Sequence, residues 1–126
     1  MGELDKRLLD LLKEECKKQV NRKEQQSLIK LCAGSKYCYV SQEEICYIVS
    51  DRSSTTVFTD SKEYRCSRSL GEWMKLLNNP LFVHCHRSYI VNVCKILDYK
   101  ENKFILSSGE KVCVSRRFAQ SVFSMV

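Results

Sequence analysis

From residue 27 onward the chain consists of short runs of β-branched and aromatic residues separated by polar turns. The clearest runs are SLIKLC, YCYVS, CYIVS, TTVFT and EYRC, followed by strands expected at about 82–86, 93–99 and 103–107 and by a short last run, VCV. Such runs, bounded by residues that favour turns, are typical of β-strands. Long helices do not alternate with them and no segment repeats, so the pattern predicts a mainly β domain and disfavours a parallel βαβ sheet.

Short helices are predicted where a capping residue precedes a helical apolar pattern. In SRSLGEWMKLLNNP, Ser69 is the expected N-cap and Glu72 follows three residues later. SQEEI predicts one helical turn in which Ser41 and Glu44 form a capping box, and SRRFAQSVFSM predicts a last helix capped by Ser115. The segments YIVN, KENK and SSGEK are expected to be turns.

The first 20 residues have a different, helical pattern. Leu4, Leu8, Leu11 and Leu12 recur at three- and four-residue spacing, and charged residues fill the other side. A polar stretch, KKQVNRKEQQ, follows. We therefore expect an amphipathic helix and linker at residues 1–24 and a β-rich domain at residues 25–126. The sequence leaves open whether the helix docks on this domain or acts as a dimerisation arm.

Positive charge is concentrated near the C-terminus of this 126-residue chain, whose net charge is +6. Residues 81–126 carry seven Lys or Arg against three Asp or Glu, an excess of +4, which favours an anionic partner. No apolar run approaches the roughly 18 residues of a membrane span, and no secretion signal is present. We therefore expect a cytoplasmic protein without membrane insertion.

The eight cysteines include no C-x-x-C pair. Most lie inside apolar runs such as YCYVS and VNVCKIL, where cysteine behaves as a small hydrophobic residue. A disulfide scaffold is the alternative, but no sequence feature supports export. We expect reduced, mostly buried thiols.

The stretch FVHCHRSYIVN at residues 82–92 raises three chemical possibilities: a metal site, a catalytic pair or a recognition surface. Side chains alternate along a strand, so His84 and His86 face one side and Cys85 the other. Two histidines without a second ligand cluster are a poor metal site, and Cys85 cannot use His86 as its base across the strand. The chain also has no phosphate loop or paired-carboxylate motif, so we expect neither an enzyme nor a bound cofactor.

Recognition of an anion accounts better for the arginines and hydroxyls of this chain. Arg87 and Ser88 follow a predicted strand, Arg116 and Arg117 begin the last predicted helix, and the polar loop DRSST supplies Arg52. A guanidinium group donates two parallel hydrogen bonds to a phosphate or to the O6/N7 edge of guanine. Three such segments are typical of a nucleic-acid-binding surface, although solvent-exposed loops of no function remain an alternative.

The runs PLFVHCHRSYIVNVCKI and FILSSGEKVCVSRRF closely resemble the LytTR DNA-binding domain of bacterial transcriptional regulators. The resemblance extends over about residues 26–124, with VSQEEICYIVS and YRCSRSLGEW similar to further family segments. It implies a mainly β fold of about ten short strands in several small antiparallel sheets, with a few short helices. It also implies sequence-specific binding of double-stranded DNA, in which loops enter successive major grooves, usually at paired direct repeats.

The resemblance further implies which side chains contact DNA. Base contacts are assigned chiefly to Arg87 and Arg117, and Phe82 with Tyr89–Val91 is expected to anchor the junction in the core. The full set of expected DNA-binding residues comprises Arg52, Ser53, Ser54, Thr55, His86, Arg87, Ser88, Lys111, Ser115, Arg116 and Arg117.

Control of this chain is expected to differ from that of most LytTR regulators, because residues 1–24 are too few for a receiver domain. A regulatory protein partner, homodimerisation through tandem sites or the N-terminal helix, or oxidation of Cys85 would serve instead. The redox idea assumes that neighbouring positive charge lowers the thiol pKa; a packed cysteine is the alternative. The main rival function is a LytTR-like module that binds a protein without reading DNA, and RNA binding is disfavoured because the aromatic residues lie in apolar runs.

Overall fold

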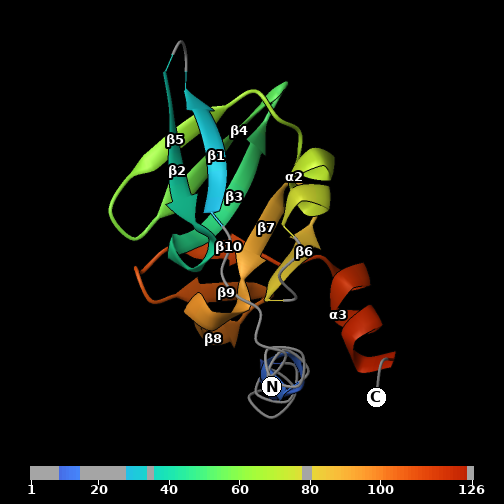
Figure 1. Ribbon diagram of the computed structural model, residues 1–126. Helices are drawn as coiled ribbons and strands as arrows, with labels where there is room; N and C mark the ends of the chain where they lie inside the picture. Colours follow the sequence, from blue (N-terminus) through green and yellow to red (C-terminus); the bar gives the residue numbers. More distant parts are fainter. Residues whose placement is uncertain (1–8, 15–27, 34–35, 78–80, 125–126) are drawn as a thin grey trace.

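The computed structural model describes residues 9–14, 28–33, 36–77 and 81–124, and within them ten strands form three antiparallel sheets (Figure 1). A two-stranded sheet pairs β1 (Leu28–Ala33) with β2 (Lys36–Ser41). A five-stranded sheet has the order β5 (Glu63–Cys66), β4 (Ser54–Thr59), β3 (Ile45–Asp51), β7 (Tyr89–Asn92) and β6 (Phe82–His86). A three-stranded sheet has the order β10 (Lys111–Cys113), β9 (Lys103–Leu106) and β8 (Ile96–Lys100). The expectation of a mainly β fold of about ten short strands is confirmed.

Helices are short. They are α2 (Leu70–Leu76), α3 (Arg116–Ser124), two 3-10 turns at Gln42–Glu44 and Val93–Lys95, and a helical segment at residues 9–14. Ser69 and Glu72 form the predicted capping box at the start of α2. Ser115 caps α3 as predicted, because its Oγ accepts a hydrogen bond from the Phe118 N–H at 3.1 Å. No helix within the described residues is long and apolar enough to span a bilayer.

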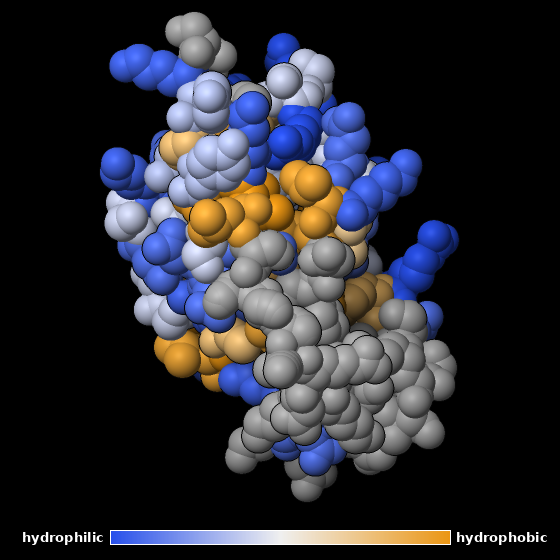
Figure 2. Space-filling model, viewed as in Figure 1, coloured by the Kyte–Doolittle hydropathy of each residue, from blue (hydrophilic) through white to orange (hydrophobic). Residues whose placement is uncertain are grey.

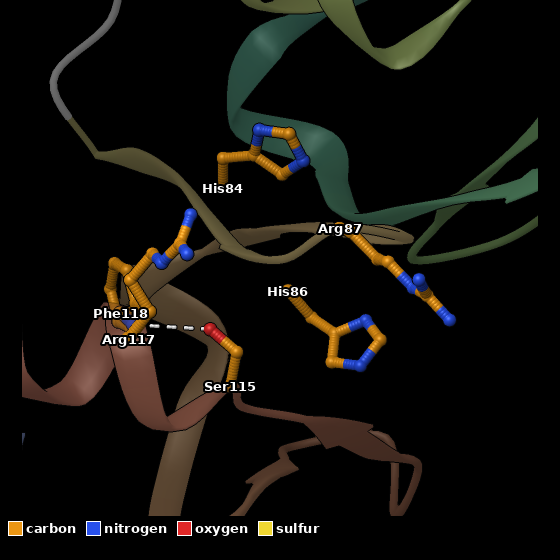
Figure 3. A pocket seen from close by; sticks show the side chains of 6 residues that line it. All are labelled: His84, His86, Arg87, Ser115, Arg117 and Phe118. Atoms are coloured by element: carbon orange, nitrogen blue, oxygen red, sulfur yellow. Dashed lines mark hydrogen bonds between the residues drawn. The ribbon is translucent and has the colours of Figure 1, made fainter.

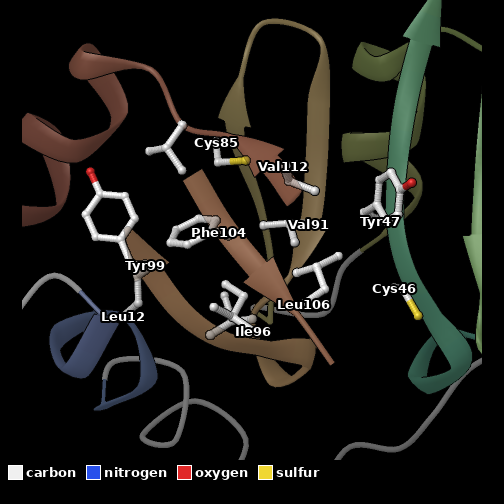
Figure 4. Close-up of a cluster of buried hydrophobic side chains, with 12 residues drawn as sticks. Leu12, Cys46, Tyr47, Cys85, Val91, Ile96, Tyr99, Phe104, Leu106 and Val112 are labelled. Carbon is white, nitrogen blue, oxygen red and sulfur yellow. The ribbon is translucent and has the colours of Figure 1, made fainter. Parts of the chain in front are cut away.

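The central strands bury both faces, because alternate residues enter two different cores. Phe82 and Ile90 pack with the β1–β2 hairpin and α2, around the fully buried Trp73. Cys85 and Val91 pack on the opposite side, against the three-stranded sheet (Figure 4). Both ends of the β6–β7 hairpin are therefore fixed by packing, as predicted for its anchor residues.

The helical segment at residues 9–14 docks on the domain. Leu12 is buried in the core beside Ile96 and Tyr99 (Figure 4), and Lys13 Nζ donates to the Ile96 carbonyl at 2.9 Å. Of the two roles considered for the N-terminal helix, docking is the one observed for these residues. The predicted boundary after residue 24 lies outside the described residues.

Local structure differs from the sequence-based expectation at three places. The segment YIVN is strand β7 rather than a turn, since Tyr89 pairs with Val49 and the buried Ile90 with Ile48. The next strand begins at Ile96, because Val93–Lys95 forms a 3-10 turn. The turn after Ser41 is also a 3-10 turn. The Ser41 Oγ accepts a hydrogen bond from the Glu43 N–H at 3.3 Å, whereas a capping box would require it to accept from the N–H of the next residue, Glu44.

Candidate nucleic-acid interface

A groove with a volume of about 850 Å³ lies where the start of α3 meets strand β6 and the β6–β7 turn (Figure 3). Its lining side chains are His84, His86, Arg87, Ser115, Arg117 and Phe118. No carboxylate is among these lining residues, so within the described part of the chain the groove presents positive charge and hydrogen-bond donors. Such a surface suits an anionic ligand.

The β6–β7 turn is held in place by hydrogen bonds on both sides. The Ser88 N–H donates to His86 Nδ1 at 3.1 Å, and the imidazole lies edge-on to the Tyr89 ring with centroids 5.6 Å apart. The Ser50 N–H donates to the Ser88 carbonyl at 2.9 Å, which fastens the turn to β3. Because Nδ1 is an acceptor, the neutral His86 ring carries its proton on Nε2, which makes that atom a hydrogen-bond donor.

The start of α3 forms the other wall of the groove. The Ser115 N–H donates to the Cys85 carbonyl at 2.8 Å and so joins this wall to β6. Arg116 and Arg117 occupy the first helical turn, which contains no acidic residue. A cation at the positive end of a helix dipole is unfavourable by a few tenths of a kcal/mol, so these arginines contribute nothing to the stability of the helix terminus. An anionic partner gives them a role.

The β3–β4 hairpin lies at the same end of the five-stranded sheet as the β6–β7 turn, because β3 pairs with both β4 and β7. Arg52 and Ser53 form its two-residue turn, and both are exposed. Arg52 has φ 61°, a left-handed conformation that costs a non-glycine residue about 1–2 kcal/mol. Asp51 pairs with Arg65 at 3.1 Å, and Arg52 itself is exposed.

The prediction that Thr55 contacts DNA is wrong in the structure, because Thr55 is fully buried. Its Oγ1 accepts from Trp73 Nε1 at 2.9 Å and donates to the Arg68 carbonyl at 2.9 Å. Thr55 therefore joins β4 to α2 beneath the hairpin. Ser54, also expected in the loop, is the first residue of β4 and is half-buried.

Cys85 does not meet the condition for a redox sensor. Its side chain is fully buried, and burial raises the pKa of the Cys85 thiol to about 12. The Sγ donates to the Cys113 carbonyl at 3.5 Å. Of the two alternatives considered for Cys85, the packed cysteine is the one observed, because strand alternation turns Cys85 into the core while His84 and His86 face the groove.

We predict that Cys85 is protected from thiol reagents in the folded protein. Hydrogen peroxide or a maleimide should modify Cys94, which is exposed, and leave Cys85 unmodified until denaturant is added. Mass spectrometry of peptides after brief treatment measures both sites in one sample. Modification of Cys85 as fast as Cys94 would contradict the buried position.

Lys111 and Arg116 are exposed but are not among the residues that line the groove. Lys111 begins β10, opposite Ile105 of β9. Conversely, His84 and Phe118 line the groove although neither was in the expected DNA-binding set. Strand alternation had already put His84 on the same side as His86, and this was the available signal. Among the described residues, no cluster of three His, Cys, Asp or Glu side chains is arranged to hold a metal ion.

Comparison with known proteins defines the class of this chain as a DNA-binding domain. The family model of the LytTr DNA-binding domain matches residues 35–126, and the chain belongs to the LytTR family. This is a DNA-binding family rather than a class of enzyme.

Similar proteins include regulators from two bacteria. The chain is 31% identical over 84 residues to the transcriptional regulatory protein LytR of Staphylococcus aureus, which covers 63% of this chain and 34% of LytR. It is 30% identical over 93 residues to the sensory transduction protein LytT of Enterococcus faecalis, which covers 69% of this chain and 38% of LytT. The chain thus spans little more than a third of the length of these relatives.

The fold is also similar to a solved structure, the LytTr DNA-binding domain of a response regulator from Bacillus cereus. The two have a TM-score of 0.67 and 27% sequence identity, and the match covers 79% of this chain and 95% of that one. The arrangement of strands around the groove is therefore that of a LytTR domain.

Proposed function

We propose that this chain is a sequence-specific transcriptional regulator that binds double-stranded DNA through the groove between β6, the β6–β7 turn and α3. The observation that carries this proposal is that two arginines from distant parts of the sequence, Arg87 and Arg117, line one groove with two histidines and no carboxylate. A module that binds only protein has little need for that combination. Family membership supports the same function.

In this proposal the groove side chains divide into two roles. Arg87 and Arg117 read base edges, since a bidentate arginine–guanine pair discriminates against other bases by about 1–3 kcal/mol. In Figure 3 their side chains extend to opposite sides of His86, so each addresses a different position on the duplex. Contacts to the phosphate backbone are assigned to His86, Ser88, Lys111, Ser115 and Arg116.

The β3–β4 hairpin supplies the remaining contacts of the proposal. Arg52 and Ser53 project from the end of the sheet that also carries the β6–β7 turn, and Ser54 follows at the start of β4. We assign the hairpin to the flank of the DNA-binding site. We place the protein in the cytoplasm. Two copies at direct repeats, one helical turn or a multiple of it apart, would each use the same groove.

Selection from random duplexes tests this function. The chain should enrich one motif, and footprinting should find two protected copies of it separated by about 10–10.5 base pairs or a multiple. Enrichment of no motif would contradict sequence-specific binding. A single protected copy would contradict the paired arrangement alone.

A second candidate, binding of a regulatory protein, is favoured by one exposed surface. Leu28, Tyr37 and Tyr39 on the β1–β2 hairpin are 65%, 60% and 58% exposed. Figure 2 shows a mostly hydrophilic face with hydrophobic side chains near its centre and at its lower left; tyrosine side chains are pale on this scale. Exposed aromatic side chains are enriched at protein interfaces. Replacing both tyrosines with serine should leave DNA binding unchanged and abolish capture of such a partner, if the hairpin is its site.

The strained turn residue Arg52 gives a prediction that separates stability from binding. Arg52→Gly should leave the free energy of unfolding unchanged or raise it by up to about 1 kcal/mol, because glycine adopts positive φ without a Cβ penalty. DNA affinity should nevertheless fall for all sequences, and the slope of log affinity against log salt should decrease by about one. Urea unfolding and fluorescence anisotropy measure the two effects.

Asn102→Gly is the matched control for Arg52→Gly. Asn102 also has positive φ, 62°, but it lies in the β8–β9 turn and does not line the groove. The free energy of unfolding of this variant should change as little as that of Arg52→Gly. Its DNA affinity should equal that of wild type. Equal loss of DNA affinity in both variants would contradict a direct role for the Arg52 side chain.

A further inference from the structure

His84 stands out among the groove residues because neither motif nor family resemblance assigns it a role. It lies on β6, its side chain is exposed, and it lines the groove opposite the start of α3 (Figure 3). Within the described residues its imidazole has no hydrogen-bond partner. Next to His84, strand β6 is joined to the start of α3 by the 2.8 Å hydrogen bond from the Ser115 N–H to the Cys85 carbonyl.

The position of His84 along the strand determines what it can reach on DNA. It precedes Arg87, at the turn, by three residues, and the β6–β7 pairing is irregular between Val83 and His86, so His84 lies further back along the strand than the tip of the hairpin. The major groove of B-DNA is about 8.5 Å deep. In the proposed complex, Arg87 at the tip of the hairpin touches base edges, and His84, further back on the strand, lies nearer the phosphates at the rim of the groove.

The charges around His84 determine how it responds to a phosphate. The other lining side chains that carry charge or donor groups are Arg117 on α3 and His86 and Arg87 at the end of its own hairpin. A phosphate placed in the groove beside an imidazole favours the charged form of the ring. DNA binding is therefore coupled to proton uptake, and affinity rises as pH falls across the range in which imidazole gains charge.

His86 is less suited to this coupling than His84. Its Nδ1 already accepts the Ser88 N–H at 3.1 Å, so protonation of the ring would break a bond that holds the turn. His84 has no such bond to lose. The pH-dependent part of binding should accordingly come mainly from His84.

We propose that His84 is a phosphate contact of this groove that makes DNA affinity sensitive to pH. The proposal rests on the DNA-binding function proposed above and adds a residue and a condition to it. His84 sets affinity rather than sequence preference, because a phosphate contact carries no base information.

The test compares DNA affinity at pH 6 and pH 8, at 0.1 M salt, on one selected duplex. One additional phosphate contact scales affinity as salt concentration to the power of about −0.9, which is about eightfold at 0.1 M. Wild type should therefore bind up to about eightfold more tightly at pH 6 than at pH 8. His84→Gln should lose most of this gain, with a salt slope about one unit smaller at pH 6. His84→Lys should bind at pH 8 as tightly as wild type does at pH 6, with little change on acidification.

Two controls complete the design. Ser61→His adds an imidazole at the β4–β5 turn, at the end of β4 remote from the β3–β4 hairpin, and should leave the pH dependence of wild type unchanged. Thermal unfolding should find all variants folded, since His84 and Ser61 are both exposed. A His84→Gln protein that keeps the full pH dependence, or a wild type with none, overturns this inference and leaves the proposed function standing. Failure of wild type to bind any duplex overturns both.

Discussion

Replacing Arg87 with alanine should make the chain accept any base at one operator position, with a loss of about 1–3 kcal/mol of discrimination there. Arg87 is exposed at a turn whose backbone is fixed independently, by the bonds from Ser50 to Ser88 and from Ser88 to His86. Removal of the side chain should therefore delete the proposed base contact without moving its neighbours. Repeating the duplex selection with the variant should give the wild-type motif with one degenerate position.

Arg87→Lys is the matched control for this prediction. Lysine keeps the positive charge but lacks the planar fork that makes two parallel hydrogen bonds, so it should restore overall affinity and salt dependence but not the base preference. Lys111→Ala should do the reverse, since it weakens all sequences alike and preserves the motif. If Arg87→Ala and Lys111→Ala both reduced affinity uniformly, the division between base and phosphate contacts would be wrong.

Replacing Thr55 with valine should lower the free energy of unfolding by about 1–3 kcal/mol. Valine matches the shape of threonine but leaves the buried Trp73 Nε1–H without its acceptor and the Arg68 carbonyl without its donor. An unsatisfied buried polar group costs about that much. Urea unfolding, followed through the fluorescence of Trp73, measures the change, since Trp73 is the single tryptophan of the chain.

Thr55→Ser is the control, because serine keeps the hydroxyl and loses one methyl group. It should retain most of the stability that valine loses. Under conditions where both proteins are folded, both should select the wild-type DNA motif, since Thr55 is buried. An altered motif with unchanged stability would instead restore Thr55 to the DNA-contacting set.

The strands of this fold were predictable because their signals are local. Alternation and turn residues found β2, β4 and β6 nearly to the residue, and caps found α2 and α3. YIVN was not predictable as β7, because a run of four residues carries too little pattern to tell a strand from a turn. Its identity as a strand comes from pairing with β3, about 40 residues earlier in the chain.

The site was predictable in its motifs but not in its assembly. HRS and SRR identified the two arginines that line the groove, yet nothing local brings them together. The Ser115–Cys85 bond between segments 30 residues apart does that. Thr55 was misassigned for a related reason. A polar residue in a polar loop gives no local sign that its hydroxyl accepts a hydrogen bond from a tryptophan 18 residues further along the chain. The same distance hid His84, which lines the groove only because α3 forms its other wall.

Binding to a selected duplex and to a random duplex across a range of salt concentrations tests the central claim most directly. We expect log affinity for both duplexes to fall linearly with log salt, with a slope that reflects several phosphate contacts. The selected duplex should remain the tighter ligand at every concentration, because base contacts add a term that salt does not screen away. Affinity that is independent of salt, or equal for the two duplexes, would contradict a sequence-specific DNA-binding role for this groove.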